Sequence, residues 1–159
     1  MERPAALVVD ASVVVKWFVK EADSEDAVRL RDAHTDEELS LFAPDLLVYE
    51  LANALRYRSG LGDGELEASV RALFDLDVAL IAPTAASVSR AASLAREMDV
   101  TTYDSAYLAL AQDIGSELVT CDKVFHDKVV AKVGRGTKVF MLKDYLAREK
   151  DGDKDSKQE

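Results

Sequence analysis

The sequence contains a single cysteine, Cys121, and has no long apolar run. One cysteine cannot form an internal disulfide, and no spacing of Cys and His resembles a zinc site. The apolar stretch that follows Met1 is too short for the core of a signal peptide, and about 20 consecutive apolar residues would be needed to span a bilayer. We therefore expect a reducing, cytoplasmic environment and no membrane association.

Glycine-rich phosphate-binding loops and an excess of basic residues are also missing. Neither Gly-x-x-x-x-Gly-Lys-Ser/Thr nor Gly-x-Gly-x-x-Gly occurs, which argues against a nucleotide or dinucleotide cofactor. The 20 Lys and Arg residues stand against 30 Asp and Glu, a formal net charge of −10. Nucleic-acid binders usually carry a basic face. A nucleic-acid partner is therefore disfavoured unless several acids gather in one pocket and hold cations that reverse the local field.

Short apolar segments that read as strands alternate with helical segments along the chain. We expect strands at residues 7–9, 39–43, 78–82, 118–121 and 138–142, with one or more helices between successive strands and a terminal helix from residue 143. This order predicts a mainly parallel sheet covered by helices on both faces. Residues 1–147 are expected to form one domain. Residues 148–159 are almost all charged or polar, and we expect them to form a disordered tail.

Two aspartates directly follow predicted strands. Asp10 follows residues 7–9, and Asp122 follows residues 118–121. The carboxyl ends of parallel strands lie along one edge of a sheet, and ligands bind at that edge. Aspartate is also a preferred N-cap, so both residues have a purely structural explanation, with Ser12 as a competing cap for the first helix.

Two further acids lie on predicted helices. Glu50 has mainly apolar neighbours at helical spacing, and a carboxylate in such a place is costly unless it pairs with a cation or binds a metal. Arg56 and Arg58 are the local candidates for such a pair. Asp104 could complete a capping box with Thr101.

Together the four acids point to metal chemistry. Converging carboxylates raise one another's pKa and repel, so such a cluster persists mainly where a divalent cation offsets the repulsion. All-oxygen ligation suits Mg²⁺ or Mn²⁺. The reaction that this pattern favours is metal-assisted hydrolysis of a phosphodiester, which needs no histidine base because metal coordination lowers the pKa of water.

The acids stand within four stretches that resemble the acidic motifs of PIN-domain ribonucleases, especially VapC-type toxins. These stretches are VVDASVVVKWF at residues 8–18, PDLLVYELANAL at 44–55, TYDSAYLALA at 102–111 and VTCD at 119–122. The match runs in order over about residues 5–145, and its second and third stretches are the more specific ones. Only the charged tail falls outside it.

The resemblance implies a three-layer α/β/α fold with about five strands, a homodimer, RNA as the substrate and a protein antitoxin that blocks the site. It carries over Asp10, Glu50, Asp104 and Asp122 as catalytic, metal-binding acids. Ser12 and Thr120 match positions whose hydroxyl groups support the site. The implied protein is a cytoplasmic Mg²⁺- or Mn²⁺-dependent endoribonuclease, the toxin of a VapBC-type pair.

Two alternatives remain at this point. One is a PIN fold that has lost catalysis and serves as a binding scaffold. The other is a small-molecule phosphatase of the haloacid-dehalogenase type, which also places an aspartate after its first strand. That family requires Asp-x-Asp, and here Ser12 occupies the third position.

Overall fold

A computed structural model of the chain describes residues 3–136 and 138–155. Its strands form one sheet, and every pair of neighbouring strands is parallel. The strands are β1 (Ala5–Val9), β2 (Leu39–Pro44), β3 (Ala79–Ile81), β4 (Glu117–Thr120) and β5 (Val139–Met141). The expected parallel sheet of five strands is thus confirmed, with bounds that differ from the expected ones by one or two residues.

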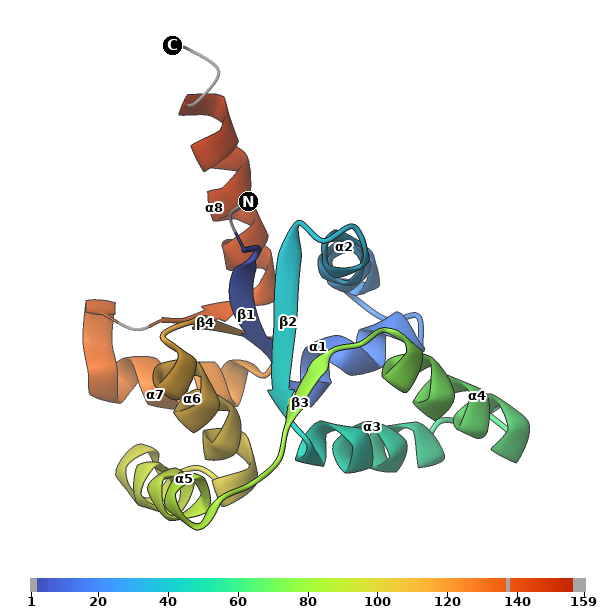
Figure 1. The fold of residues 1–159 in the computed structure, drawn as a ribbon, viewed down its shortest axis with the longest axis horizontal. Coiled ribbons are helices and arrows are strands. Elements are labelled where there is room, and N and C mark those ends of the chain that lie inside the picture. The colour runs from blue at the N-terminus through green and yellow to red at the C-terminus, as the bar shows by residue number, and fades with distance from the viewer. Residues whose placement is uncertain (1–2, 137, 156–159) are drawn as a thin grey trace.

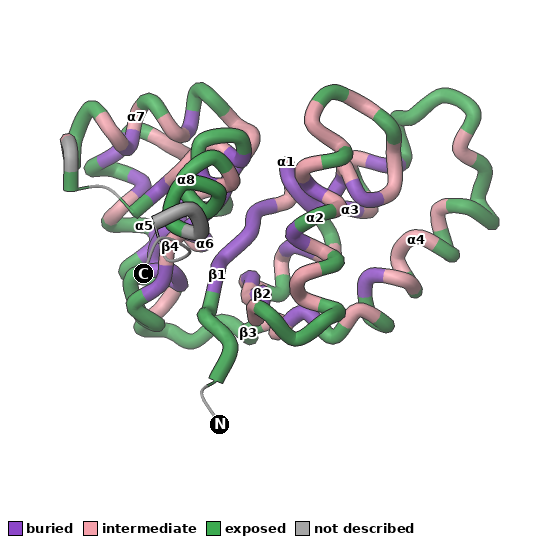
Figure 2. The backbone as a smooth tube through the Cα atoms, turned by 90° about the horizontal axis from the view of Figure 1, so that it is seen from above, coloured by how far each residue is buried: buried purple, intermediate pink, exposed green. Residues whose placement is uncertain are grey.

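Helices cover both faces of this sheet. They are α1 (Ala11–Val14), which continues into the 3₁₀ helix η1 (Val15–Trp17), α2 (Ser24–Thr35), α3 (Leu46–Arg56), α4 (Asp63–Asp75), α5 (Ala85–Met98), α6 (Thr102–Ile114), α7 (Lys123–Val133), the 3₁₀ helix η2 (Gly134–Gly136) and α8 (Leu142–Asp155). Figure 2 shows α1–α4 on one side of the strands and α5–α7 on the other. The predicted three-layer α/β/α arrangement is confirmed.

The strand order, β3-β2-β1-β4-β5, determines where a ligand site can form. The chain builds the sheet outward from β1 to β3, and then returns to place β4 on the opposite side of β1 (Figure 1). Val9 pairs with Val119 at this boundary. Such a switch in direction opens a crevice at the carboxyl ends of the two strands, which is where Asp10 and Asp122 leave the sheet.

The core explains why the helices that carry Glu50 and Asp104 are held firmly. The inner strands are apolar on both faces, as expected for a parallel sheet covered on both sides, and Val8 and Val119 are fully buried. On α3, Leu47, Leu51 and Leu55 recur every four residues and are also fully buried, so one face of this helix lies against the core.

One expectation is corrected at the start of the first helix. The first helix is capped by Asp10 and not by Ser12, because Asp10 has an extended backbone and its carboxylate accepts a hydrogen bond from the backbone N–H of Val13. Residues 148–155 continue α8 away from the body of the molecule (Figure 1), and the expected disordered tail stays a prediction. Residues 156–159 lie outside the described residues.

The boundary between a domain of residues 1–147 and a tail of residues 148–159 stays a prediction. Among the described residues, no helix combines the length and apolar character that crossing a membrane requires.

Candidate active site

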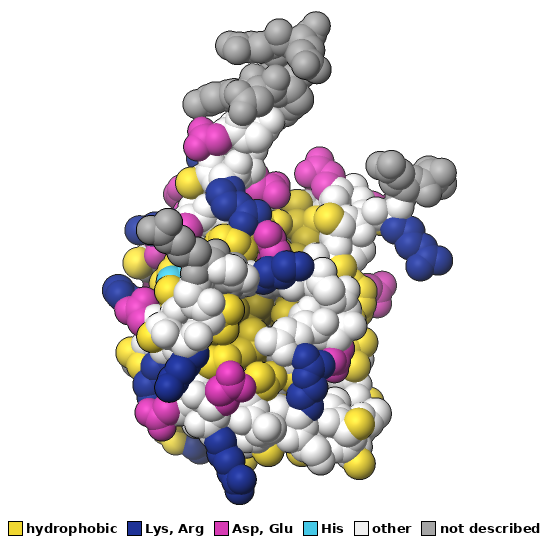
Figure 3. Space-filling model, turned by 90° about the vertical axis from the view of Figure 1, so that its left-hand side faces the viewer, with side chains coloured by type: hydrophobic (Ala, Val, Ile, Leu, Met, Phe, Trp, Pro, Cys, Tyr) yellow, Lys and Arg dark blue, Asp and Glu magenta, His cyan; other side chains and the backbone are white. Residues whose placement is uncertain are grey.

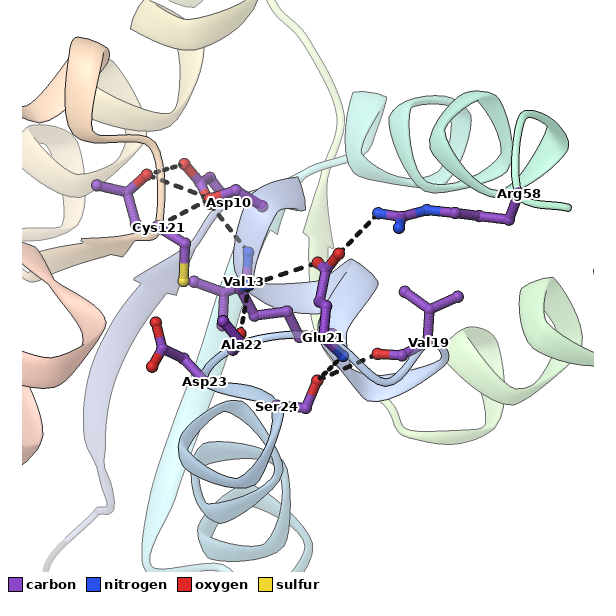
Figure 4. A network of polar contacts seen from close by, with 12 residues as sticks. Asp10, Val13, Val19, Glu21, Ala22, Asp23, Ser24, Arg58 and Cys121 are labelled. Atoms are coloured by element: carbon purple, nitrogen blue, oxygen red, sulfur yellow. Dashed lines mark hydrogen bonds and ion pairs between the residues drawn. The ribbon is translucent and has the colours of Figure 1, made fainter.

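Asp10 is the innermost of the four acids, with an exposed fraction of only 8%. The hydroxyl groups of Ser12 and Thr120 both donate hydrogen bonds to its carboxylate, one to each oxygen. The Ser12 oxygen also accepts a hydrogen bond from the backbone N–H of Cys121 at 2.8 Å. Figure 4 shows Asp10 beside Cys121, so this network joins the end of β1 to the end of β4.

Burial raises the pKa of Asp10 to about 6, and the nearby charge of Asp122 acts in the same direction. The hydrogen bonds from Ser12, Thr120 and Val13 oppose the rise without cancelling it. The supporting hydroxyl groups expected from the sequence are thus in direct contact with Asp10. Their effect is to stabilise its ionised form in a place where ionisation is unfavourable.

Asp122 is linked to the same network through Thr120. The backbone N–H of Asp122 donates to the Thr120 hydroxyl oxygen at 3.0 Å, and that hydroxyl group donates in turn to Asp10. The Asp122 carboxylate accepts a hydrogen bond from the backbone N–H of Phe125 at 3.0 Å and caps α7. The structural role of Asp10 and Asp122 as caps therefore coexists with their position at the strand ends.

Asp104 and Glu50 approach from α6 and α3. Burial raises the pKa of Asp104, and the charge of Asp122 adds to this rise. Burial likewise raises the pKa of Glu50, to which the charge of Asp104 contributes. Thr101 caps α6 by accepting a hydrogen bond from the backbone N–H of Asp104 at 3.0 Å. A hollow of about 260 Å³ opens beside Asp104 and Asp122.

The four acids therefore form an electrostatically coupled row, in which Asp122 acts on both Asp10 and Asp104, and Asp104 acts on Glu50. They do not form a tight cage. Within residues 3–136 and 138–155, no three Asp, Glu, His or Cys side chains converge closely enough to make a ready metal-binding group. This separation is consistent with the mutual repulsion of the carboxylates. It is also consistent with the hydrogen bonds that Asp10 accepts from Ser12 and Thr120, and Glu50 from Tyr107.

The chemistry of the donors nevertheless fits a hard divalent cation. The row offers carboxylate oxygens, and Mg²⁺ commonly binds through one or two carboxylates together with water and substrate phosphate, so a complete protein cage is not needed. Three of the four acids have raised pKa values because burial and neighbouring negative charge disfavour ionisation. A cation would relieve both effects.

Tyr107 is a contributor that sequence reasoning missed. Its hydroxyl group donates a hydrogen bond to Oε1 of Glu50 at 2.7 Å, and its side chain is 2% exposed. The expected arginine partners of Glu50 are engaged elsewhere: Arg56 donates to Asn53, and Arg58 pairs with Glu21. The sequence could have indicated this role, because Tyr107 follows Asp104 by one helical turn and therefore lies on the same face of α6.

Glu21 forms ion pairs with Lys16 and Arg58. Figure 4 shows it in the loop after η1, facing Arg58 of the segment that follows α3. Lys16 approaches the same carboxylate at 3.4 Å and donates to the carbonyl of Ala22 at 2.7 Å. These contacts hold the loop before α2.

A family model described as "PIN domain" matches residues 7–130 of the chain. Ribonuclease VapC3 of Pyrobaculum aerophilum is 37% identical over 131 residues, which make up 80% of this chain and 97% of that protein. The PIN-domain match spans all four segments that carry the acids.

Solved structures share the fold. The structure of PAE2754 from Pyrobaculum aerophilum has a TM-score of 0.58 at 23% identity, and the match covers 91% of this chain and 96% of that one. VapC20 of Mycobacterium tuberculosis, a toxin that cleaves the sarcin-ricin loop, has a TM-score of 0.62 at 16% identity, over 76% and 93% of the two chains. FitAcB from Neisseria gonorrhoeae has a TM-score of 0.56 at 15% identity, over 86% and 97%.

Proposed function

Because the chain belongs to the PIN-domain family, we propose that it is a VapC-type endoribonuclease, the toxin of a toxin–antitoxin pair, and that it hydrolyses RNA phosphodiester bonds with Mg²⁺ or Mn²⁺. The relative at 37% identity is a ribonuclease, and a solved structure with the same fold is an RNA-cleaving toxin. The observation that carries the metal-dependent part is the coupled row of Asp10, Glu50, Asp104 and Asp122 at the switch point of the sheet.

In this proposal, Asp10, Asp104 and Asp122 hold the cation, and Glu50 either joins them or orients the attacking water as a base. A cation held by these carboxylates would supply a water whose pKa is lowered toward neutrality, and its charge would offset that of the phosphodiester. Ser12 and Thr120 keep the Asp10 carboxylate ionised and directed into the site. Attack by water leaves a 5′-phosphate on one product and a 3′-hydroxyl on the other.

The net charge of −10 is compatible with an RNA substrate under this proposal. Figure 3 shows the face that lies on the left of Figure 1, where Lys and Arg side chains are interspersed with Asp and Glu around an apolar hollow. A bound cation among the acids makes the site itself attractive to phosphate. We accordingly expect RNA binding to depend on the divalent metal as well as on dispersed lysine and arginine contacts.

The deciding experiment incubates end-labelled single-stranded RNA with the purified protein in Mn²⁺ or in EDTA, beside an Asp104→Asn variant prepared identically. We expect cleavage by the wild type in Mn²⁺ and none in EDTA or with the variant. Equal cleavage by wild type and variant would indicate a contaminating nuclease. Products that end in a 2′,3′-cyclic phosphate would contradict the mechanism, because they result from attack by the RNA's own 2′-hydroxyl.

A catalytically inactive scaffold is the second candidate. It is favoured if the protein binds RNA but neither cleaves it nor binds Mn²⁺ in calorimetry. All four acids are present, which favours the enzyme. The toxin proposal places the protein in the cytoplasm with its RNA substrate.

The proposal includes two protein partners, an antitoxin that covers the row of acids and a second copy of the chain. An apolar groove of about 250 Å³ between α5, α6 and the ends of β2 and β3 is a candidate surface for the second copy. Ile81, Val88 and Tyr103 line it and are 41%, 48% and 68% exposed, respectively. Contiguous apolar side chains exposed to this extent are typical of an interface.

A further inference from the structure

Tyr107 ends in a hydroxyl group that stands among the acids of the candidate site. The side chain is 2% exposed, so the ring is packed in the core, while its oxygen lies 2.7 Å from Oε1 of Glu50. Burial raises the pKa of Tyr107, and the charges of Glu50, Asp10 and Asp104 all add to this rise. The hydroxyl group is therefore a neutral hydrogen-bond donor to Glu50, and it also experiences the charges of Asp10 and Asp104.

Glu50 depends on such a donor. The neighbouring charge of Asp104 repels it, and burial disfavours its ionised form. The arginines that follow it on the chain are bound elsewhere, Arg56 to Asn53 and Arg58 to Glu21. In the part of the chain that the structure describes, the Tyr107 hydroxyl group is the hydrogen-bond donor found for the Glu50 carboxylate.

The contact also joins two helices that are distant in the sequence. Tyr107 belongs to α6, one turn after Asp104, and Glu50 belongs to α3, 57 residues earlier. Leu108 and Ala111 of α6 are buried beside Tyr107, so the ring is anchored by the core and has little freedom to turn. A rigid donor of this kind holds a carboxylate in one orientation.

We propose that Tyr107 is a positioning residue for RNA hydrolysis, whose hydroxyl group holds the Glu50 carboxylate toward Asp104. This inference rests on the proposed function for the reaction that Glu50 serves. Tyr107 acts through Glu50 and does not itself touch the reacting atoms. Its contribution therefore disappears when Glu50 can no longer act as a carboxylate.

The first test is Tyr107→Phe, which removes one oxygen and keeps the ring that fills the core. We expect kcat for RNA cleavage in Mn²⁺ to fall roughly 10- to 100-fold, with KM for RNA changed by less than about threefold, because a misplaced catalytic group costs rate more than substrate binding. Calorimetry should show Mn²⁺ binding weakened about threefold or more. Unchanged kcat and unchanged Mn²⁺ affinity would overturn the inference.

Tyr145→Phe is the matched control. Tyr145 is a second buried tyrosine, 8% exposed, which packs beside Phe140 at the start of α8. Losing its hydroxyl group should leave kcat and Mn²⁺ affinity at wild-type values. If Tyr145→Phe lowered kcat as much as Tyr107→Phe, general loosening of the core would be the cause, and the positioning role would be rejected.

A double-mutant cycle separates positioning from structural support. Mn²⁺ affinity and residual kcat are compared for wild type, Tyr107→Phe, Glu50→Gln and the double variant. We expect Tyr107→Phe to have less than a twofold further effect in the Glu50→Gln background, because residues that act as a unit are non-additive. A loss of the same size in both backgrounds would show that Tyr107 acts independently of Glu50.

The outcomes also separate this inference from the function on which it rests. A wild-type protein that cleaves no RNA in Mn²⁺ contradicts the proposed function, and the Mn²⁺-binding cycle then still tests the coupling of Tyr107 to Glu50. An active wild type with an unaffected Tyr107→Phe variant contradicts only the role of Tyr107.

Discussion

Asp10 combines two roles at the level of a single residue. As the N-cap of α1 it accepts a hydrogen bond from the backbone N–H of Val13, and as a buried carboxylate it contacts Ser12 and Thr120 at the end of β4. Its exposed fraction is 8%, whereas Glu50, Asp104 and Asp122 are more accessible. The ionised form of Asp10 therefore destabilises the metal-free fold more than an exposed acid does.

Replacing Asp10 by Asn should stabilise the metal-free protein at pH 7.5 by up to about 3 kcal/mol. The folded-state pKa of Asp10 is raised from 3.8 to about 6, so the fold penalises ionisation. This penalty appears as the pH rises above 3.8 and is complete above about 6. The gain should accordingly shrink to about 1 kcal/mol at pH 4.5.

Urea unfolding in EDTA at the two pH values measures this gain. Glu97→Gln, which removes an exposed acid from α5, is the control and should change stability little at either pH. An Asp10→Asn variant less stable than wild type at pH 7.5 would contradict the expected sign.

Thr120→Val should destabilise the protein by about 1–3 kcal/mol and lower RNA cleavage. Thr120 is fully buried, and its hydroxyl group both donates to Asp10 and accepts from the backbone N–H of Asp122. Valine fills the same space but leaves the Asp10 carboxylate and the backbone N–H of Asp122 without the hydroxyl group that both contact. Thermal unfolding and the RNA assay check the result, with Thr120→Ser as the variant that should retain more activity.

At the level of the element, α6 is the helix that presents both Asp104 and Tyr107. Thr101 caps it by accepting a hydrogen bond from the backbone N–H of Asp104, which is one of the two hydrogen bonds of the predicted capping box. The neighbouring helix α5 begins with the same kind of cap, in which Thr84 accepts a hydrogen bond from the backbone N–H of Ser87 at 3.0 Å. The two caps are a natural pair for comparison.

Thr101→Ala and Thr84→Ala should each reduce stability by about 1 kcal/mol. Only Thr101→Ala should also lower kcat, because Asp104 lies in the first turn of the helix that Thr101 caps, whereas α5 carries none of the four acids. Chemical unfolding and RNA cleavage are measured for both. If kcat stayed unchanged in Thr101→Ala, or fell equally in both variants, the cap of α6 would have no specific role in placing Asp104.

At the level of the whole molecule, the row of acids makes the fold dependent on its ionic surroundings. Coupled carboxylates destabilise the metal-free state, and any cation that binds only the folded state stabilises it by mass action. The whole sheet participates, because Asp10 and Asp122 leave adjacent strands while Glu50 and Asp104 are held by helices on opposite faces of the sheet (Figure 2).

Adding Mn²⁺ at about 100 times its Kd should therefore stabilise the wild type by about 3 kcal/mol, a rise in Tm of roughly 5–10 °C. The rise should be clearly smaller for Asp104→Asn, which removes one carboxylate from the row. Thermal unfolding in Mn²⁺ and in EDTA gives the difference. An equal rise for both proteins would place the bound cation elsewhere.

The proposed homodimer is tested by Val88→Glu, which places a charge in the apolar groove between α5 and α6. We expect the wild type to sediment as a dimer and the variant as a monomer, because a buried unpaired charge is costly at an interface. Val133→Glu, at an exposed valine at the end of α7, should remain dimeric. A monomeric wild type would contradict the proposal.

Most of the fold follows from local pattern. Short apolar segments predicted each strand within one or two residues. The errors lie where a local rule competes with a tertiary contact. Ser12 was a reasonable cap for α1, but its hydroxyl group is used to join Asp10 to the backbone of Cys121.

The sequence by itself determined the strand–helix alternation, and it predicted the four acids as site residues through the motifs around them. The tertiary structure alone decided which of these acids lie near one another, because Asp122 comes near Asp10 only once β4 pairs with β1. It also decided that Glu50 is held by Tyr107 and not by an arginine. Hydrogen bonds between groups 57 or 110 residues apart depend on how the elements pack, and no local periodicity encodes that packing.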